Sequence, residues 1–340
     1  MKAYVLHDIN NLKYEEVSKP QPDFSRNEVL VKVKAVGVCG SDIPRIFTKG
    51  TYHYPLIPGH EFSGKIVEAQ DEELLGKRVG VFPLIPCMKC PQCIKGEYEM
   101  CSDYDYIGSR RDGAFAEYVT VPRENLIFLP EGVSYEAAAM LEPMAVAAHA
   151  VRRINPKKDE TVAVCGLGTI GMLVTMMLIE RGVKDIIIIA NKEYQRQMAM
   201  KLGIPKENIG LKDRRIDVFF ECVGTNETIS WALDFTAPGG RVMLVGNPAS
   251  DMEFKRETYW KILRKQLTLM GTWNSSYSMG GFRLFINPDD WNYVLEKIAN
   301  KSIDPTRIIT HQYPLNELIC GLEIMRNKSE DYIKVMGVLE

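Results

Sequence analysis

Four cysteines that lie close together in the sequence constrain this chain most strongly. Cys87, Cys90, Cys93 and Cys101 follow the spacing C-x2-C-x2-C-x7-C. Gaps of two residues let successive thiolates turn back onto one ion, and four thiolates around one ion form a closed, tetrahedral Zn²⁺ site of the structural kind. A bacterial iron–sulfur ligand run has a closer fourth cysteine followed by proline, whereas Cys101 is followed by Ser102. The spacing therefore predicts a structural zinc site.

The bulk properties indicate an ordinary globular enzyme. The chain has 340 residues, which suggests about two domains. A net charge of −2 and a pI of about 6.3 give no electrostatic footprint for nucleic acid or for an anionic membrane. The first residues contain no apolar signal-peptide core, and no apolar run reaches the length of a membrane span. We expect a cytoplasmic, reducing location, where cysteines are ligands or buried thiols rather than disulfides.

The hydrophobic pattern changes near Ser134. Before it, short β segments are separated by Gly and Pro, as at residues 28–36 and 115–121, which predicts a β-rich domain. After it, apolar strands alternate with helices, which predicts a doubly wound parallel sheet. The expected strands are residues 161–165, 185–190, 218–222 and 241–245, with helices at 170–181 and 193–202. Helix 291–299 and strand 333–339 are expected near the C-terminus.

A glycine-rich turn joins the first strand and helix of this parallel sheet. Its residues are Gly166, Leu167, Gly168, Thr169, Ile170 and Gly171, which form a G-x-G-x-x-G string. The string is weak evidence alone, but between a buried strand and a helix it indicates a dinucleotide-binding turn. The glycines allow close backbone approach, and the helix N-terminus faces the pyrophosphate.

The end of the next strand bears on the choice of dinucleotide. Folds that select NAD place Asp or Glu there to accept from the ribose 2′-OH, whereas this chain has Ala190, Asn191 and Lys192. A small neutral residue removes repulsion against a 2′-phosphate, and Lys192 would pair with it. The residues favour NADP over NAD. The alternative is a solvated Lys192 and an enzyme that uses NAD with weak discrimination.

Two loops of the β-rich domain carry a second set of metal-binding residue types. They read Cys39-Gly40-Ser41-Asp42 and Pro58-Gly59-His60-Glu61. A thiolate and an imidazole are ligands of catalytic Zn²⁺, which keeps one coordination position open for substrate. Asp42 is a candidate for orienting His60 through the other ring nitrogen.

Across its whole length the chain resembles the zinc-containing medium-chain dehydrogenases. The resemblance rests on CGSD, PGHE, the four-cysteine segment, DGAFAEY and GLGTIG, in the order and spacing of that family. It implies an α/β protein with a GroES-like catalytic domain, residues 1–144 and 275–340, and a Rossmann domain, residues 145–274. It also implies two Zn²⁺ per chain and a homodimer or homotetramer.

Residues 141–146, LEPMAV, resemble the sorbitol and polyol dehydrogenase branch of that family. This resemblance implies Cys39, His60 and a glutamate as ligands of the catalytic zinc, and leaves open whether Glu61 or Glu142 is the direct third ligand. Ser41 matches the hydroxyl that relays the alcohol proton. The family often has a histidine three residues beyond that hydroxyl, where this chain has Pro44, so the exit route of the proton differs.

Two further stretches resemble dehydrogenases of sugar-alcohol phosphates of the galactitol-1-phosphate type. They are YDYIGSRRDG at residues 104–113 and KILRK at 261–265, the latter followed by Gly271-Thr272-Trp273. We expect Arg110 and Arg111 to suit a phosphate, unless they face solvent or hold the domains together. Other polar partners expected for a polyol are Ser41, Ser109, Glu142, Trp273 and Asn274.

The expected reaction is hydride transfer between a polyol or polyol phosphate and NAD(P), which gives the ketose or ketose phosphate. One alternative is a plain secondary-alcohol dehydrogenase or reductase with an apolar pocket. An alternative of another class is a dinucleotide-binding sensor without catalysis, because a fold does not fix a function.

Overall fold

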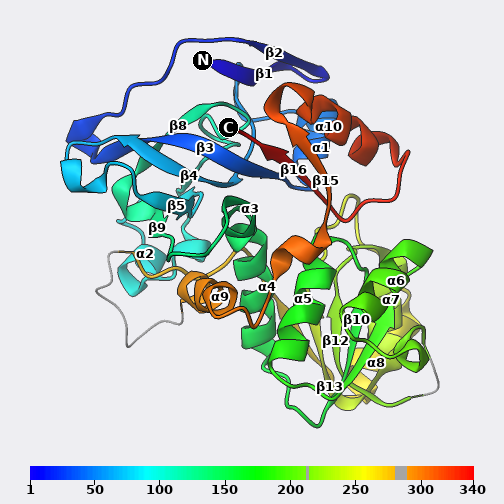
Figure 1. Ribbon diagram of the computed structural model, residues 1–340. Helices are drawn as coiled ribbons and strands as arrows, with labels where there is room; N and C mark the ends of the chain where they lie inside the picture. Colours follow the sequence, from blue (N-terminus) through cyan, green and yellow to red (C-terminus); the bar gives the residue numbers. More distant parts are fainter. Residues whose placement is uncertain (212–213, 280–288) are drawn as a thin grey trace. The chain divides into compact units, whose positions relative to one another are not determined.

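The computed structural model describes residues 1–211, 214–279 and 289–340. The chain divides into two compact units, of which the first contains residues 1–142 and 276–340 and the second contains residues 143–275. Each unit has its own main β-sheet (Figure 1). Helix α4 (Leu141–Ile154) begins at the end of the first segment of unit one and continues into unit two.

The first unit is built mainly from antiparallel strands. Its main sheet has the order β15-β16-β3-β4-β5-β9, and β8 also pairs with β3. Only β15 and β16 run parallel among these neighbours. The strands are β1 (Lys2–Asp8), β2 (Asn11–Glu16), β3 (Glu28–Val38), β4 (Glu61–Glu68), β5 (Arg78–Val81), β6 (Leu84–Ile85), β7 (Asp105–Tyr106), β8 (Tyr118–Pro122), β9 (Leu126–Phe128), β15 (Ile309–Pro314) and β16 (Lys334–Val338). The helices are α1 (Asp42–Pro44), α2 (Pro91–Lys95), α3 (Tyr135–Ala139), α9 (Asp290–Ala299) and α10 (Leu318–Asn327).

The middle strand of this sheet, β3, brings distant segments together. Its Val29, Val31 and Val33 are buried in the core, while Lys32 and Lys34 alternate with them and are only half-buried. On one side Gly37 pairs with Glu61 of β4, and on the other it pairs with Met336 of β16. The end of β3 therefore lies beside the starts of β4 and β16, and this register positions the cluster of candidate metal ligands described below.

The second unit contains a parallel sheet with the strand order β11-β10-β12-β13-β14. Its strands are β10 (Thr161–Cys165), β11 (Asp185–Ile189), β12 (Ile216–Glu221), β13 (Thr236–Leu244) and β14 (Thr268–Gly271), and its helices after α4 are α5 (Thr169–Glu180), α6 (Glu193–Lys201), α7 (Asn226–Phe235) and α8 (Arg256–Arg264). Successive side chains of a strand face opposite sides, and both sets are buried here: Ala163 and Phe219 in one apolar cluster, and their neighbours Val164 and Phe220 outside it. The predicted α/β fold class is confirmed.

The order of the strands sets the place of a ligand. The chain enters at β10, adds β11 on one side and then crosses to add β12 on the other side. In open parallel sheets, ligands bind outside the carboxyl ends of the strands at such a switch point. Here those ends are Cys165 and Glu221, which are partners in the register.

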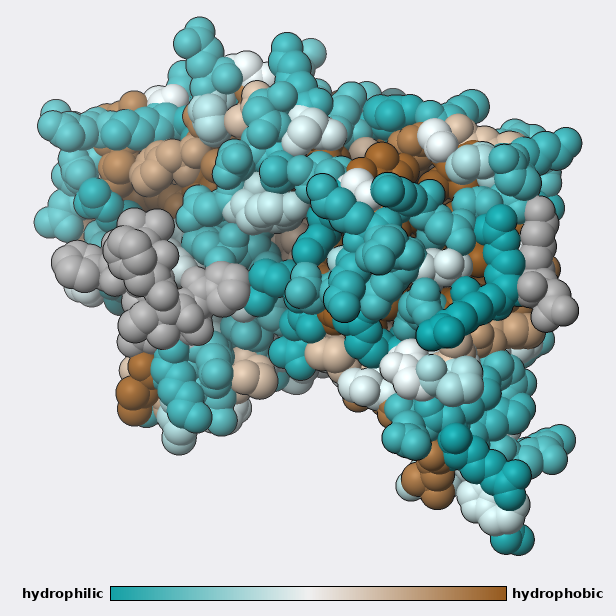
Figure 2. Space-filling view, turned by 90° about the horizontal axis from the view of Figure 1, so that it is seen from below, coloured by the Kyte–Doolittle hydropathy of each residue, from teal (hydrophilic) through white to brown (hydrophobic). Residues whose placement is uncertain are grey.

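The surface carries both polar and apolar areas. On the face shown in Figure 2 most side chains are hydrophilic, and hydrophobic residues form smaller separate areas. Among residues 1–211, 214–279 and 289–340, no helix combines the length and the apolar character that crossing a membrane requires.

Candidate active site and metal centres

The four clustered cysteines converge on a single point in the first unit. Their sulfur atoms all lie within 4.8 Å of one another. The Sγ atoms of Cys87 and Cys93 are 4.0 Å apart, and those of Cys90 and Cys101 are 3.9 Å apart. Zn–S bonds of about 2.3 Å in a tetrahedron require sulfur–sulfur edges of about 3.8 Å. The cluster therefore has the dimensions of a tetrahedral Zn²⁺ site.

Local sequence explains how this arrangement forms. Cys90 is the N-cap of α2, Pro91 occupies its first turn, and Gly96 ends it in the left-handed conformation. The short helix holds Cys90 and Cys93 close together, and the Cys93 N–H donates to Cys90 Sγ over 3.4 Å. This hydrogen bond, with others from nearby main chain, lowers the pKa of the Cys90 thiol to about 6. Burial raises the pKa of the Cys93 and Cys101 thiols, but a bound zinc ion deprotonates the thiols that coordinate it. The fit to zinc therefore rests on four sulfur donors that converge on one point.

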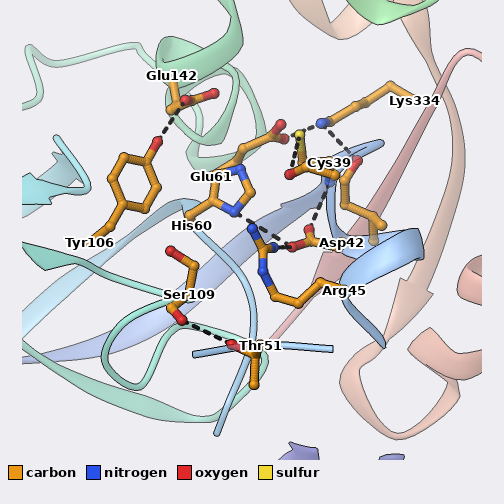
Figure 3. A network of polar contacts seen from close by, with 12 residues as sticks. Cys39, Asp42, Arg45, Thr51, His60, Glu61, Tyr106, Ser109, Glu142 and Lys334 are labelled. Atoms are coloured by element: carbon orange, nitrogen blue, oxygen red, sulfur yellow. Dashed lines mark hydrogen bonds and ion pairs between the residues drawn. The ribbon is translucent and has the colours of Figure 1, made fainter. Parts of the chain in front are cut away.

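The second cluster is formed by Cys39, His60 and Glu61, whose ligand atoms also lie within 4.8 Å of one another. Cys39 directly follows β3, His60 directly precedes β4, and Glu61 is the first residue of β4. Figure 3 shows the three side chains turned toward one another. Burial and then the nearby carboxylates Glu61, Asp42 and Glu142 raise the pKa of the Cys39 thiol. A half-buried thiol, a buried imidazole and a buried carboxylate that converge in this way are a donor set that fits Zn²⁺.

Asp42 stabilises the loop that carries Cys39. Its carboxylate accepts from the Cys39 N–H over 3.0 Å and from Arg45 Nη1 over 2.6 Å. His60 Nδ1 is 3.6 Å from Asp42 Oδ1, which is beyond hydrogen-bond length, and this buried nitrogen has no hydrogen-bond partner among the described residues. The hydrogen bonds of Asp42 therefore go to the Cys39 N–H and to Arg45, and the expected hydrogen bond to His60 is not formed.

Glu61 also forms an ion pair with a residue of β16, the strand on the other side of β3. Lys334, the first residue of β16, forms an ion pair with Glu61 and donates to the Val38 carbonyl over 3.0 Å (Figure 3). Its side chain is only 1% exposed, and a buried ammonium requires such a partner. Gly37 makes room for the pair, because a Cβ there would overlap Glu61 Oε2 and lie 2.8 Å from Lys334 Cε.

Glu142 lies close to the cluster but outside the set of converging ligand atoms. Tyr106 donates its hydroxyl hydrogen to Glu142 Oε1 over 3.2 Å, and its ring meets that of His60 edge-on at 5.7 Å. Burial, followed by the Glu61 charge, raises the pKa of Glu142 to about 7, although His60 and Lys334 oppose the shift. The structure thus brings both glutamates near His60, with Glu61 in the inner position.

Ser41 is exposed and donates to Cys39 Sγ over 3.2 Å. It is the N-cap of α1, and Pro44 is the last residue of that helix. The hydroxyl that is predicted to relay the alcohol proton is therefore in contact with the cluster. Arg45, the residue after Pro44, is bound to Asp42.

The predicted dinucleotide turn has the expected strand–turn–helix context, between β10 and α5. Gly166 has φ +89°, and a Cβ there would overlap Val223. A Cβ on Gly171 would overlap the Gly166 carbonyl oxygen, whereas one on Gly168 would meet nothing within 4 Å. There is therefore no room for a side chain at Gly166 or Gly171, whereas the space next to Gly168 is open. Leu167 is buried, and Thr169 and Ile170 begin α5. The turn therefore fits a pyrophosphate.

The segment after β11 contains a lysine and a glutamate that is paired with an arginine. Asn191 is exposed, and Lys192 is the N-cap of α6 with its Nζ 5.5 Å from the Tyr194 ring centre. Glu193 accepts two bonds from Arg196, of 2.9 and 2.7 Å, and Arg196 also donates to the Ala190 carbonyl.

The predicted substrate residues fall into separate environments. Ser109 is buried, and its carbonyl accepts from Thr51 (Figure 3). The Arg110 guanidinium stacks between the rings of Tyr52 and Tyr104, at 4.6 and 4.1 Å, and donates to the Tyr104 carbonyl. Trp273 and Asn274 belong to the second unit, where Trp273 is 59% exposed and Asn274 has φ +55°.

Arg111 is engaged differently from Arg110. It forms a 2.8 Å ion pair with the buried Glu28 and lies 3.8 Å from Asp105. It also lines a cavity of about 440 Å³ that none of Cys39, His60, Glu61 or Glu142 lines.

Sequence reasoning missed three residues of this region: Lys334, Tyr106 and Gly37. A lysine at the start of the apolar strand KVMGV was the available signal for Lys334. Tyr106 lies within residues 104–113, a stretch in which the arginines are the residues expected to bind substrate. Nothing in the sequence distinguishes Gly37 from other strand glycines, because a glycine is needed there only to make room for the ion pair of Glu61 and Lys334.

Comparisons with known proteins agree with this geometry. Residues 25–131 match the family model described as alcohol dehydrogenase GroES-like domain, and residues 169–300 match the model described as zinc-binding dehydrogenase. Galactitol 1-phosphate 5-dehydrogenase of Escherichia coli K12 is 36% identical over 303 residues, which are 84% of this chain and 86% of the relative. Sorbitol dehydrogenase of Halalkalibacterium halodurans is 31% identical, covering 99% and 98% of the two chains.

A solved structure is similar to this chain over its whole length. The crystal structure of galactitol-1-phosphate dehydrogenase from Escherichia coli superposes with a TM-score of 0.88 at 30% identity, over 99% of this chain and 100% of the other. The chain therefore belongs to the zinc-containing medium-chain dehydrogenases, in the alcohol and polyol dehydrogenase group, and it is an oxidoreductase.

Proposed function

We propose that this enzyme oxidises a polyol phosphate of the galactitol-1-phosphate type to the ketose phosphate, or catalyses the reverse reduction, with NADP. In the oxidation a secondary alcohol loses a hydride from carbon and a proton from oxygen, which gives a ketone. The hydride reduces the nicotinamide, and the proton leaves to solvent. The claim that the substrate is phosphorylated rests on one observation. Arg110 stacks on two tyrosine rings, whereas Arg111 forms an ion pair with Glu28.

The residues of the first unit would divide the chemistry among themselves. Cys39, His60 and Glu61 would hold a zinc ion, with Glu142 nearby as the alternative carboxylate. A bound zinc ion supplies Lewis acidity, which lowers the pKa of the substrate hydroxyl. Ser41 would relay the hydroxyl proton, accepting it while its own proton passes to solvent, because it is exposed and lies beside Cys39. Lys334 and Asp42 would keep Glu61 and the Cys39 loop in position.

Contacts that lead outward from His60 support Arg110 as the phosphate-binding residue. The ring of His60 contacts Tyr106 at 5.7 Å, Tyr106 contacts Tyr104 at 6.1 Å, and Arg110 stacks on Tyr104 at 4.1 Å. A guanidinium has five N–H donors in a planar fork, so the bond to the Tyr104 carbonyl leaves donors for an anion. The charge of Arg111 is already balanced by Glu28. Arg110 is therefore the better candidate for a phosphate at the far end of a polyol chain.

Substitution of the two arginines separates these roles. We expect Arg110→Ala to reduce the kcat/KM advantage of galactitol 1-phosphate over galactitol by about tenfold or more, because a charge-assisted bond contributes about 1.5–3 kcal/mol. Arg111→Ala should keep the advantage and instead lower the thermal midpoint, since it removes the cation that is paired with the buried Glu28 and leaves the Asp23 N–H as its donor. The opposite result, loss of the advantage in Arg111→Ala alone, would show that the phosphate contact was assigned to the wrong residue.

Charges at the end of β11 support NADP. Ala190 contributes no carboxylate, and the Glu193 charge is matched by Arg196. Lys192 is then the cation of this strand end that would meet a 2′-phosphate. We expect Ala190→Asp to shift the ratio of kcat/KM for NADP over NAD by about tenfold or more toward NAD, because the new carboxylate repels the 2′-phosphate.

Ala190→Asn is the matched control for this change, since asparagine has nearly the same shape without the charge. It should move the ratio much less than aspartate does. A strong preference of the unmodified enzyme for NAD would refute the cofactor proposal, whatever the variants do.

A further inference from the structure

A buried glutamate at the switch point of the parallel sheet takes part in none of the chemistry described above. Glu221 is the last residue of β12, is 0% exposed, and is the register partner of Cys165, the last residue of β10. The dinucleotide turn begins at the next residue after Cys165. Glu221 therefore lies at the sheet edge where a dinucleotide binds in this fold.

Glu221 ties together the loops that follow β12 and β13. Its Oε1 accepts from the Val223 N–H over 2.8 Å, from the Gly224 N–H over 2.9 Å and from the Thr228 hydroxyl over 2.8 Å. Its main-chain carbonyl accepts from the N–H groups of Val245 and Gly246 over 2.8 and 2.9 Å. One residue thus fixes two loops at the carboxyl edge of the sheet.

These loops pack directly against the glycine turn. The Cys222 N–H donates to the Cys165 carbonyl over 2.8 Å. Val223 occupies the space where a Gly166 side chain would be, and Gly246 lies so close to Gly224 that a Cβ would overlap the Gly224 nitrogen. Movement of the Val223–Gly224 segment would therefore remove the contact that supports Gly166 in its left-handed conformation.

The second carboxylate oxygen indicates that this position does not serve stability alone. Glu221 Oε2 is buried and has no hydrogen-bond partner among the described residues. An unpaired buried acceptor costs folding free energy, and such costs are found where function constrains a residue. We propose that Glu221 is a positioning residue for dinucleotide binding, which acts through Val223 and Gly224 to hold the glycine turn in its binding conformation.

Dinucleotide binding to the purified, zinc-loaded protein tests this proposal without any polyol. Titration of NADPH, or of NADH if the unmodified protein binds only NADH, is followed by the fluorescence of the dinucleotide and should give a Kd about tenfold or more higher for Glu221→Ala than for the unmodified protein. In a separate assay with a polyol that the enzyme oxidises, kcat at saturating dinucleotide should stay within about threefold, because the reacting groups are untouched. Glu221→Gln keeps an oxygen in the Oε1 position and should bind NADPH within about threefold of the unmodified protein.

Asn208→Ala is the matched control within the same unit. Asn208 is buried and bonds to Asp185 and to the Ile186 carbonyl, at the amino end of β11 and away from the glycine turn. Its loss should lower the thermal midpoint and leave the Kd for NADPH unchanged. The proposal is overturned if Glu221→Ala binds NADPH normally, or if Asn208→Ala weakens binding equally.

Should Glu221→Ala fail to fold, two conservative variants decide the question. Glu221→Asp keeps the charge but is one methylene too short to reach all three donors, whereas Glu221→Gln keeps the reach without the charge. We expect NADPH to bind less tightly to the aspartate variant than to the glutamine variant. The reverse order would mean that the charge matters and that the hydrogen bonds to the Val223–Gly224 segment do not.

Discussion

Cys39→Ser should lower kcat by about a thousandfold while leaving the fold intact. At neutral pH a serine hydroxyl stays protonated and is a poor ligand for zinc, so the buried cluster with His60 and Glu61 should lose its ion. Lewis-acid stabilisation contributes several kcal/mol to the transition state, and each 1.36 kcal/mol corresponds to a tenfold change in rate. Metal analysis should find two zinc ions per chain in the unmodified enzyme and one in the variant.

Cys320→Ser is the control for this experiment, because Cys320 is an exposed free thiol on α10. It should keep both zinc ions and full activity. Normal turnover in Cys39→Ser, or two zinc ions retained by an inactive variant, would contradict the role assigned to Cys39.

Cys93→Ser should have the second large effect, this time on stability. Cys93 is buried, and its sulfur atom is one of four that converge on the predicted structural ion. A structural zinc ion supplies folding free energy directly. We expect the free energy of unfolding to fall by about 3 kcal/mol or more, which lowers the thermal midpoint by about 10 °C.

Zinc content and melting temperature must change together in this variant. The remaining zinc should be one ion per chain, and residual activity at low temperature should exceed that of Cys39→Ser. If Cys93→Ser keeps two zinc ions and the original melting temperature, the four cysteines do not form a structural metal site.

The sequence was most informative where chemistry depends on short-range spacing. The turn from Gly166 to Gly171 lies between a strand and a helix, as predicted, because local glycine positions decide its conformation. The four cysteines converge for a related reason, since Cys90, Pro91 and Gly96 build a one-turn helix. In both places the contacts that matter lie within a few residues of one another.

Contacts across the sheet could not be read from the sequence. The pairing of Lys334 with Glu61 joins residues that are 273 positions apart in the chain, and it depends on the register of β16 on β3 and of β3 on β4. The expected strand at residues 115–121 shows the same limit: β8 begins only at Tyr118, whereas Ala116 pairs with Ala3. Periodicity located an extended segment, but its partners were set by tertiary packing.

The difference between Arg110 and Arg111 also needed the structure. The two arginines are adjacent in sequence and looked equivalent as phosphate ligands. Glu28, which pairs with Arg111, is the first residue of β3 and 83 residues away in the chain. Neutralisation by a distant carboxylate leaves no signature next to the arginine itself.

A paired kinetic comparison on the unmodified enzyme tests most directly whether it prefers phosphorylated polyols to free ones. Values of kcat/KM for galactitol 1-phosphate and for galactitol would be measured with saturating NADP, followed by sorbitol and ribitol with their phosphates. We predict that at least one phosphorylated polyol is favoured over its free form by about ten- to a hundredfold, as expected for a charge-assisted contact. Equal efficiency on free and phosphorylated polyols throughout the series would refute the proposed phosphate contact and leave a polyol dehydrogenase without a phosphate site.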